Sequence, residues 1–169
     1  MNKTIERQYL ENVIKEFQKL KALGEKTFGQ IRDEDFFWTP DPESNSIAII
    51  VRHMSGNMIS RWTDFLTTDG EKPDRNRDSE FETLFYTDKD DILNRWEKGW
   101  KRVFDTINFL KDDDLIKVVT IRNEPHSVVE AINRQLTHYA YHVGQIVYIG
   151  KHLRSDEWKS LSIPRKKAE

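Results

Sequence analysis

The sequence predicts an all-α protein, a four-helix bundle formed by a single domain that spans residues 1–169. Apolar residues recur at intervals of three and four over long stretches, as they do on the buried face of a helix. Only seven glycines and five prolines interrupt the chain, so these stretches contain few helix breakers. A chain of this length can bury about 70% of the surface that it exposes when unfolded, which is enough for one core.

The first helix is predicted over residues 2–31, where lysines and glutamates fill the face opposite the apolar stripe. The second helix is predicted to begin at a cap formed by Ser44 or Ser46, because both serines precede an apolar periodic run. Its apolar face continues to Phe65, and we expect the helix to end near Thr68.

The third helix is predicted to begin after a cap at Thr87 or Asp88 and to end near Lys111. Trp96 and Trp100 lie one turn apart on its apolar stripe. The pair could form a stacking platform for a ligand, but this spacing favours packing in the core or at its rim.

The fourth helix is predicted over residues 127–152, with Ser127 as the cap and Glu130 completing a capping box. Residues 115–122 are rich in β-branched side chains and roughly alternate, and the turn-forming residues 123–127 follow them. We expect an irregular extended segment or a small hairpin there.

Composition excludes several classes of protein. Charged residues make up 33% of the chain but nearly balance, with a net charge of −2, so no nucleic-acid partner is expected. No apolar stretch approaches the roughly 18 residues of a transmembrane helix, and no apolar signal region precedes the first helix, so we expect a cytoplasmic protein with no membrane partner. Cysteine is absent, which excludes disulfides, thiolate ligands and a cysteine nucleophile.

Two histidines in the fourth predicted helix form the main candidate site. His138 and His142 are four residues apart, so they project from the same side of the helix and can share one metal ion. His53 in the second helix is the candidate third ligand, whereas His126 in a turn and His152 at the helix end are not expected to bind metal. The alternative is that the pair consists of hydrogen-bonded histidines at the edge of a helix interface.

The long link over residues 67–86 decides whether the three histidines can meet. It can stretch to roughly 60 Å, whereas the second helix is about 35 Å long, so the chain can return and start the third helix parallel to the second. In that up-down-down-up order, the histidines of the second and fourth helices lie at the same level. An up-down-up-down order would separate them by about 10 Å along the axis. Within the link, residues 74–78 could bind phosphate, but their acids neutralise their arginines and favour a solvated linker.

Three segments resemble one known family. The run HYAYHVGQI at 138–146, His53 within VRHMSGN, and the closing WKSLSIPRKK look like the DinB-like, bacillithiol-transferase-like superfamily of four-helix bundles, in an uncharacterised subgroup. The resemblance implies an up-down-down-up bundle, often a homodimer, in which His53, His138 and His142 hold a divalent metal ion, zinc or nickel. Some relatives are metal-dependent thiol transferases that use bacillithiol or mycothiol, and others have no established activity.

Three neutral imidazoles would leave one position open on a tetrahedral ion and would leave its +2 charge uncompensated. Such a position favours an ionised water, which leads to hydrolysis, or a thiolate, which leads to thiol transfer. Any thiol would have to come from a small molecule, because the protein lacks cysteine. Asn57 and Gln145 are candidates for orienting the ligands or the substrate, or they are ordinary polar surface residues. Tyr139 and Tyr141 flank the pair and are expected to be structural.

The sequence therefore supports a metal-dependent enzyme that acts on a small-molecule substrate, either a thiol transferase or a hydrolase. A non-catalytic bundle of the stress-protein type, which binds a metal or a ligand without turnover, is the alternative. A purely structural bundle without metal is the third interpretation.

Overall fold

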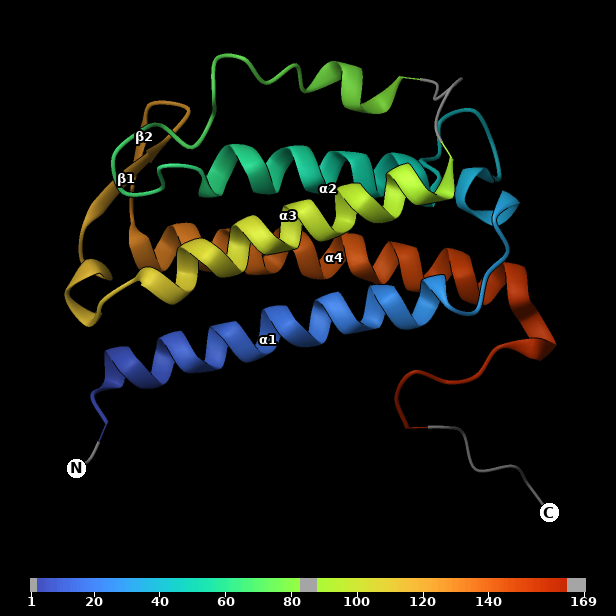
Figure 1. Cartoon of the computed structure of the whole chain (residues 1–169), viewed down its shortest axis with the longest axis horizontal. Helices are drawn as coiled ribbons and strands as arrows, with labels where there is room; N and C mark the ends of the chain where they lie inside the picture. The colour runs from blue at the N-terminus through green and yellow to red at the C-terminus, as the bar shows by residue number, and fades with distance from the viewer. Residues whose placement is uncertain (1–2, 83–87, 164–169) are drawn as a thin grey trace.

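Four long helices carry most of the chain in the computed structural model, which describes residues 3–82 and 88–163. They are α1 (Ile5–Phe28), α2 (Ile47–Trp62), α3 (Lys89–Phe109) and α4 (Val128–Arg154) (Figure 1). The prediction of a mostly helical bundle is confirmed. No helix in the described ranges is both long and apolar enough to span a membrane.

The four helices lie side by side (Figure 1). α2 packs most extensively against α3, and α1 against α4. The chain colours in Figure 1 show that α2 and α3 run in one direction and that α1 and α4 run in the other. α2 and α4, which carry the candidate histidines, are therefore antiparallel.

Side chains cap the helix starts at predicted positions. Ser46 caps α2 by accepting a hydrogen bond from the Ile49 N–H, and Asp88 caps α3 in the same way. Ser127 caps α4, and Glu130 completes the predicted capping box. The alternative cap Thr87, like the first residue of the predicted first helix, lies outside the described residues.

α2 ends earlier than predicted. It ends at Trp62, six residues before Thr68, because Thr63 is extended and Asp64 takes a positive φ of 48°. Phe65 is nevertheless buried and packs on Trp62 with ring centroids 5.0 Å apart. Apolar residues thus continue at helical spacing after the helix has ended, because Phe65 packs on the core from a non-helical segment. This explains why the helix was predicted to end near Thr68.

The other helix ends differ from prediction by two or three residues. α1 ends at Phe28 instead of Ile31, α3 ends at Phe109 instead of Lys111, and α4 continues two residues past the predicted end to Arg154. Terminal turns commonly produce differences of this size.

The segment before α4 is a small antiparallel hairpin, one of the two predicted forms. Strands β1 (Val118–Ile121) and β2 (Glu124–Ser127) pair so that the first residue of β1 lies opposite the last residue of β2. Arg122 and Asn123 form the turn with φ values of 57° and 62°, as a two-residue type I′ hairpin turn requires. Both of their N–H groups donate to the carboxylate of Asp69, which fastens the link after α2 to the hairpin.

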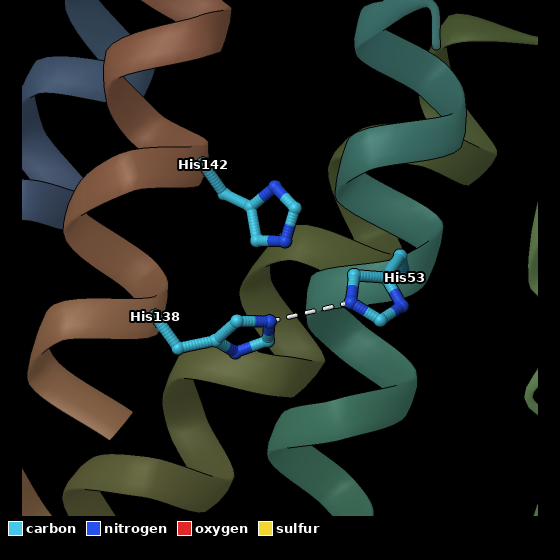
Figure 2. Close-up of side chains that lie close together, drawn as sticks. All are labelled: His53, His138 and His142. Atoms are coloured by element: carbon cyan, nitrogen blue, oxygen red, sulfur yellow. Dashed lines mark hydrogen bonds between the residues drawn. The ribbon is translucent and has the colours of Figure 1, made fainter. Parts of the chain in front are cut away.

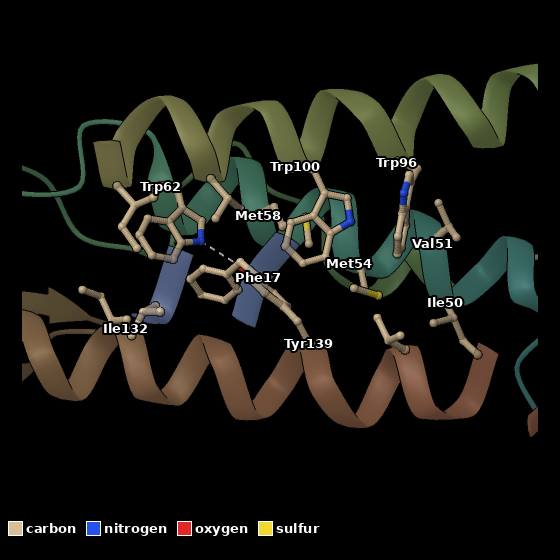
Figure 3. Close-up of a cluster of buried hydrophobic side chains, with 14 of the residues drawn as sticks. Phe17, Ile50, Val51, Met54, Met58, Trp62, Trp96, Trp100, Ile132 and Tyr139 are labelled. Atoms are coloured by element: carbon tan, nitrogen blue, oxygen red, sulfur yellow. Dashed lines mark hydrogen bonds between the residues drawn. The ribbon is translucent and has the colours of Figure 1, made fainter. Parts of the chain in front are cut away.

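Several large aromatic side chains meet in the core among aliphatic ones (Figure 3). Phe17 lies edge-on to Trp62 and Trp100, at centroid distances of 5.9 and 6.1 Å, and 5.9 Å from Tyr139. Such arrangements are favoured by the ring quadrupoles and add to the gain from burial. Trp96 and Trp100 are both buried, so the pair packs in the core as the sequence favoured.

The link between α2 and α3 lies along α2 and contains a short 3-10 turn at Asp78–Phe81 (Figure 1). The prediction of a solvated linker is wrong for part of it. The side chains of Arg75 and Glu80 are only 6% and 8% exposed. These charges are buried because they pair with each other and with a histidine of α2. Residues 83–86 of the link lie outside the described residues.

Candidate metal centre

The three candidate histidines meet between α2 and α4. His53 projects from α2 toward His138 and His142, which lie one turn apart on α4 (Figure 2). Each side chain offers a ring nitrogen, and these three atoms all lie within 4.8 Å of one another. His53 and His142 are buried, and His138 is half-buried. The structure thus brings the third histidine to the pair, as the sequence predicted.

The spacing of the ring nitrogens suits a shared ion. The Nε2 atoms of His53 and His138 lie 3.3 Å apart. Two nitrogens bound to one tetrahedral zinc ion at about 2.0–2.1 Å would be separated by about 3.3 Å. Because the remaining separations are within 4.8 Å, small rotations of the rings would bring all three nitrogens around one ion.

Hydrogen bonds at Nδ1 direct two of the Nε2 atoms toward this shared space. His53 Nδ1 lies 2.8 Å from Glu80 Oε2, and His142 Nδ1 lies 2.8 Å from Gln145 Oε1. Since both oxygens are acceptors, each Nδ1 carries the proton and each Nε2 keeps its lone pair. Among the described residues, the buried Nε2 of His142 has no hydrogen-bond partner, which a bound cation would supply.

The imidazole rings of His138 and His142 are neutral at physiological pH. Burial, followed by the neighbouring His142 and His53, lowers the pKa of His138 to about 3. Burial also lowers the pKa of His142 to about 4, against the opposing effect of its hydrogen bond with Gln145. A neutral imidazole is the form that binds a metal ion, so both rings are in the protonation state that a metal site requires.

Glu80 is a residue of this site that sequence reasoning missed. It comes from the link, 27 positions after His53, and is itself held by Arg75. Arg75 Nε donates to Glu80 Oε1 at 2.8 Å, and Arg75 Nη2 donates to Oε2 at 2.9 Å. This is the two-pronged arrangement of a strong guanidinium–carboxylate pair. The only sequence signal was a link rich in arginine and acids.

A second carboxylate in the link, that of Glu71, accepts hydrogen bonds from three arginines. Its Oε2 accepts hydrogen bonds from Arg61 at 2.9 Å and Arg122 at 2.8 Å, and its Oε1 accepts one from Arg75 at 3.3 Å. Although partial burial acts in the opposite direction, the bonds from Arg122 and Arg61 lower the pKa of Glu71 to about 2. Glu71 is therefore ionised at neutral pH and holds these arginines next to the histidines.

The two residues proposed to orient ligands occupy different positions. Gln145 contacts a histidine directly, as described above. Asn57 is buried and accepts a hydrogen bond from the Tyr139 hydroxyl at 3.1 Å, while that hydroxyl accepts one from Trp62 Nε1 at 3.0 Å. Tyr139 therefore has the structural role that the sequence favoured. Asn57 also borders a cavity beside the histidines, and its role toward a ligand stays a prediction.

A cavity of about 510 Å³ opens beside His53 and His138. Tyr141, which was expected to be only structural, lines this cavity, and its ring centroid lies 4.1 Å from that of His142. Five arginines also line it, namely Arg61, Arg75, Arg77, Arg122 and Arg134. The volume suits a small organic molecule, so the centre has a space in which such a molecule could bind.

The two histidines that were not expected to bind metal lie elsewhere. His126 is in β2, and the ring of His152 packs on Trp38 near the end of α4, with centroids 5.4 Å apart. Neither belongs to the group of histidines described above.

Comparison with known proteins adds a family but no activity. A search of curated proteins finds no match for this chain. A family model described as protein of unknown function (DUF1572) matches residues 4–167, nearly the whole chain. The chain therefore belongs to the DUF1572 family of proteins of unknown function.

Proposed function

We propose that His53, His138 and His142 bind one divalent metal ion, zinc or nickel, and that the protein is an enzyme that uses this ion to activate a small thiol or water. The observation that carries the proposal is the convergence of three ring nitrogens within 4.8 Å, one of which, His142 Nε2, is buried without a hydrogen-bond partner among the described residues. A hydrogen-bonded histidine pair with only a structural role would not require this convergence.

A divalent ion held by three neutral imidazoles keeps its full charge and, when bound, would lower the pKa of a thiol or water molecule at its open position. The protein's own residues prepare this site. Glu80 and Gln145 hold the Nδ1 protons of two rings, so that the lone pairs of both Nε2 atoms face the shared space. The adjoining cavity gives a substrate access to it.

The proposal includes the DinB-like superfamily with its up-down-down-up topology and a homodimer. The helix directions in Figure 1 and the position of His53 opposite the α4 pair support the topology. The use of a small thiol fits the absence of cysteine from the sequence, since the protein supplies no thiol of its own. The dimer follows from the resemblance alone, and sedimentation of the purified protein would test it.

The test is an activity screen on untagged protein loaded with zinc or nickel. One arm measures loss of free thiol from bacillithiol, mycothiol or glutathione in the presence of an electrophile, and the other measures hydrolysis of esters and amides. We expect turnover in one arm, its loss in His142→Ala, and its retention in His152→Ala. Stoichiometric metal without turnover in either arm would contradict the enzyme and support the non-catalytic metal-binding alternative.

A further inference from the structure

The cavity beside the histidines has an unusually cationic lining. Five of its lining residues are arginines, and none is an acid. Glu71 and Glu80 lie behind this lining and pair with Arg61, Arg75 and Arg122. Two carboxylates offset three guanidinium groups, so the lining keeps an excess of positive charge even before Arg77 and Arg134 are considered.

Three of the arginines have donors available for a ligand. Arg122 uses only its Nε toward Glu71, and its side chain is 54% exposed. Arg77 has one long ion-pair contact of 3.4 Å with Asp78, whose side chain is 92% exposed, and the Arg77 guanidinium group lies over the Phe81 ring, 5.1 Å from the centroid, which uses no N–H donor. No ion pair of Arg134 occurs among the described residues, and its side chain is exposed. These three guanidinium groups come from the link, the hairpin turn and α4, so they surround the cavity.

Buried polar atoms in the same lining also lack partners. Gln135 is only 3% exposed, and its Oε1 accepts no hydrogen bond from any residue that the structure describes. Arg61 is 5% exposed, and its Nε donates no hydrogen bond to any described residue. Leaving such groups buried and unpaired costs free energy, because they lose their hydrogen bonds to water without gaining others. Both side chains line the cavity, so a polar ligand there could satisfy them.

We propose that this cavity binds the anionic part of a small-molecule ligand, a carboxylate or phosphate group held by Arg77, Arg122 and Arg134. Guanidinium groups bind both oxyanions through paired N–H donors, which explains why arginine is used there. Gln135 accepts a hydrogen bond from an N–H or O–H group of the same molecule. That this molecule is the substrate of the metal centre rests on the proposed function; the anion site itself does not.

The experiment measures thermal stabilisation of full-length, untagged, metal-free protein by inorganic phosphate and, separately, by malonate at low ionic strength. A ligand that binds only the folded state raises the free energy of unfolding by RT ln(1 + c/Kd), where c is the free ligand concentration, so the melting temperature rises with the logarithm of that concentration once it exceeds Kd. We expect at least one anion to raise the melting temperature with this dependence on its concentration. Its apparent Kd should weaken about ten-fold in Arg134→Gln and in Arg122→Gln, because each loses a charge-assisted hydrogen bond. Arg32→Gln removes an exposed arginine outside the cavity and serves as the matched control.

The two anions distinguish the chemical groups. Stabilisation by phosphate alone identifies a phosphate ligand, by malonate alone a carboxylate, and by both a general oxyanion site. The proposal is overturned if neither anion stabilises the protein. It is also overturned if Arg134→Gln binds the anion as well as the wild type and the control Arg32→Gln do. His142→Ala separates this proposal from the metal centre, since His142 does not line the cavity. We expect this variant to lose metal and to keep anion binding.

Discussion

His53 Nδ1 lies 2.8 Å from Glu80 Oε2, and the two side chains are only 7% and 8% exposed. This contact joins the α2 helix to the long link that follows it. Burial alone would raise the pKa of Glu80, but hydrogen bonds with His53 and Arg75 outweigh it and lower that pKa. An ionised Glu80 fixes the proton of His53 on Nδ1, so Nε2 keeps its lone pair for a metal ion.

Replacing Glu80 with glutamine should weaken metal binding without removing a ligand. The amide lacks the charge that favours the Nδ1 proton and can no longer accept both bonds from Arg75. We expect zinc affinity, measured by competition with a chromogenic chelator, to fall by about 10–100-fold. Glu82→Gln changes an exposed carboxylate two residues away and should leave the affinity unchanged. Equal affinities for Glu80→Gln and the wild type would show that Glu80 does not position His53.

Gly56→Ala should also disturb the contact between His53 and Glu80, by displacing Glu80. A Cβ at Gly56 would overlap the carboxylate of Glu80, which would have to move away from His53. We expect zinc affinity to fall by about ten-fold or more, although no ligand or charged group is changed. The control is Gly144→Ala on α4, where a Cβ meets nothing within 4 Å among the described residues.

Gly144→Ala should instead stabilise the protein by about 0.5–1 kcal/mol, because alanine loses less backbone entropy in a helix interior. Its zinc affinity should match that of the wild type. If the two alanine variants bind zinc equally well, the close approach of α2 to the link does not control the position of Glu80.

Asp69 should make a pH-dependent contribution to stability. Although partial burial opposes ionisation, the backbone N–H groups of Glu71, Asn123 and Arg122 donate to its carboxylate and lower its pKa from 3.8 to about 2. The folded pKa lies below the unfolded one, so the contribution is complete above pH 3.8 and is lost as the pH falls toward 2.

We therefore expect Asp69→Asn to lower the free energy of unfolding by about 1–2 kcal/mol at pH 7. Urea unfolding of the variant and the wild type at a series of pH values would measure the difference. The two proteins should converge in stability as the pH approaches 2. A difference that stays constant from pH 7 to pH 2 would contradict this role for the Asp69 carboxylate.

The helices were predictable because their signals are local. Ser127 and Glu130 lie three residues apart, and His138 and His142 lie four apart, so helical geometry alone places each pair together. The end of α2 was missed because Phe65 packs on Trp62 after the backbone has left the helix. Apolar periodicity indicates which residues are buried, but it does not show whether the backbone at those residues is helical.

The missing part of the site could not be read from the sequence for a different reason. Arg75 and Glu80 are charged residues in a stretch without periodicity, a pattern that is typical of solvated loops. They are buried because they form an ion pair with each other and because Glu80 also forms a hydrogen bond with His53, which is 27 residues away in the sequence. Such pairing depends on how the link lies along α2, and no local pattern encodes that path.

Metal content per chain tests the central claim most directly. Untagged protein from cells grown with zinc and nickel should contain about one divalent ion per chain by elemental analysis, since a single three-nitrogen site is present in the described residues. His53→Ala, His138→Ala and His142→Ala should each lose most of it, whereas His152→Ala, whose ring packs on Trp38, should retain it. Metal-free wild-type protein, or a His53→Ala variant with full metal content, would contradict the three-histidine centre.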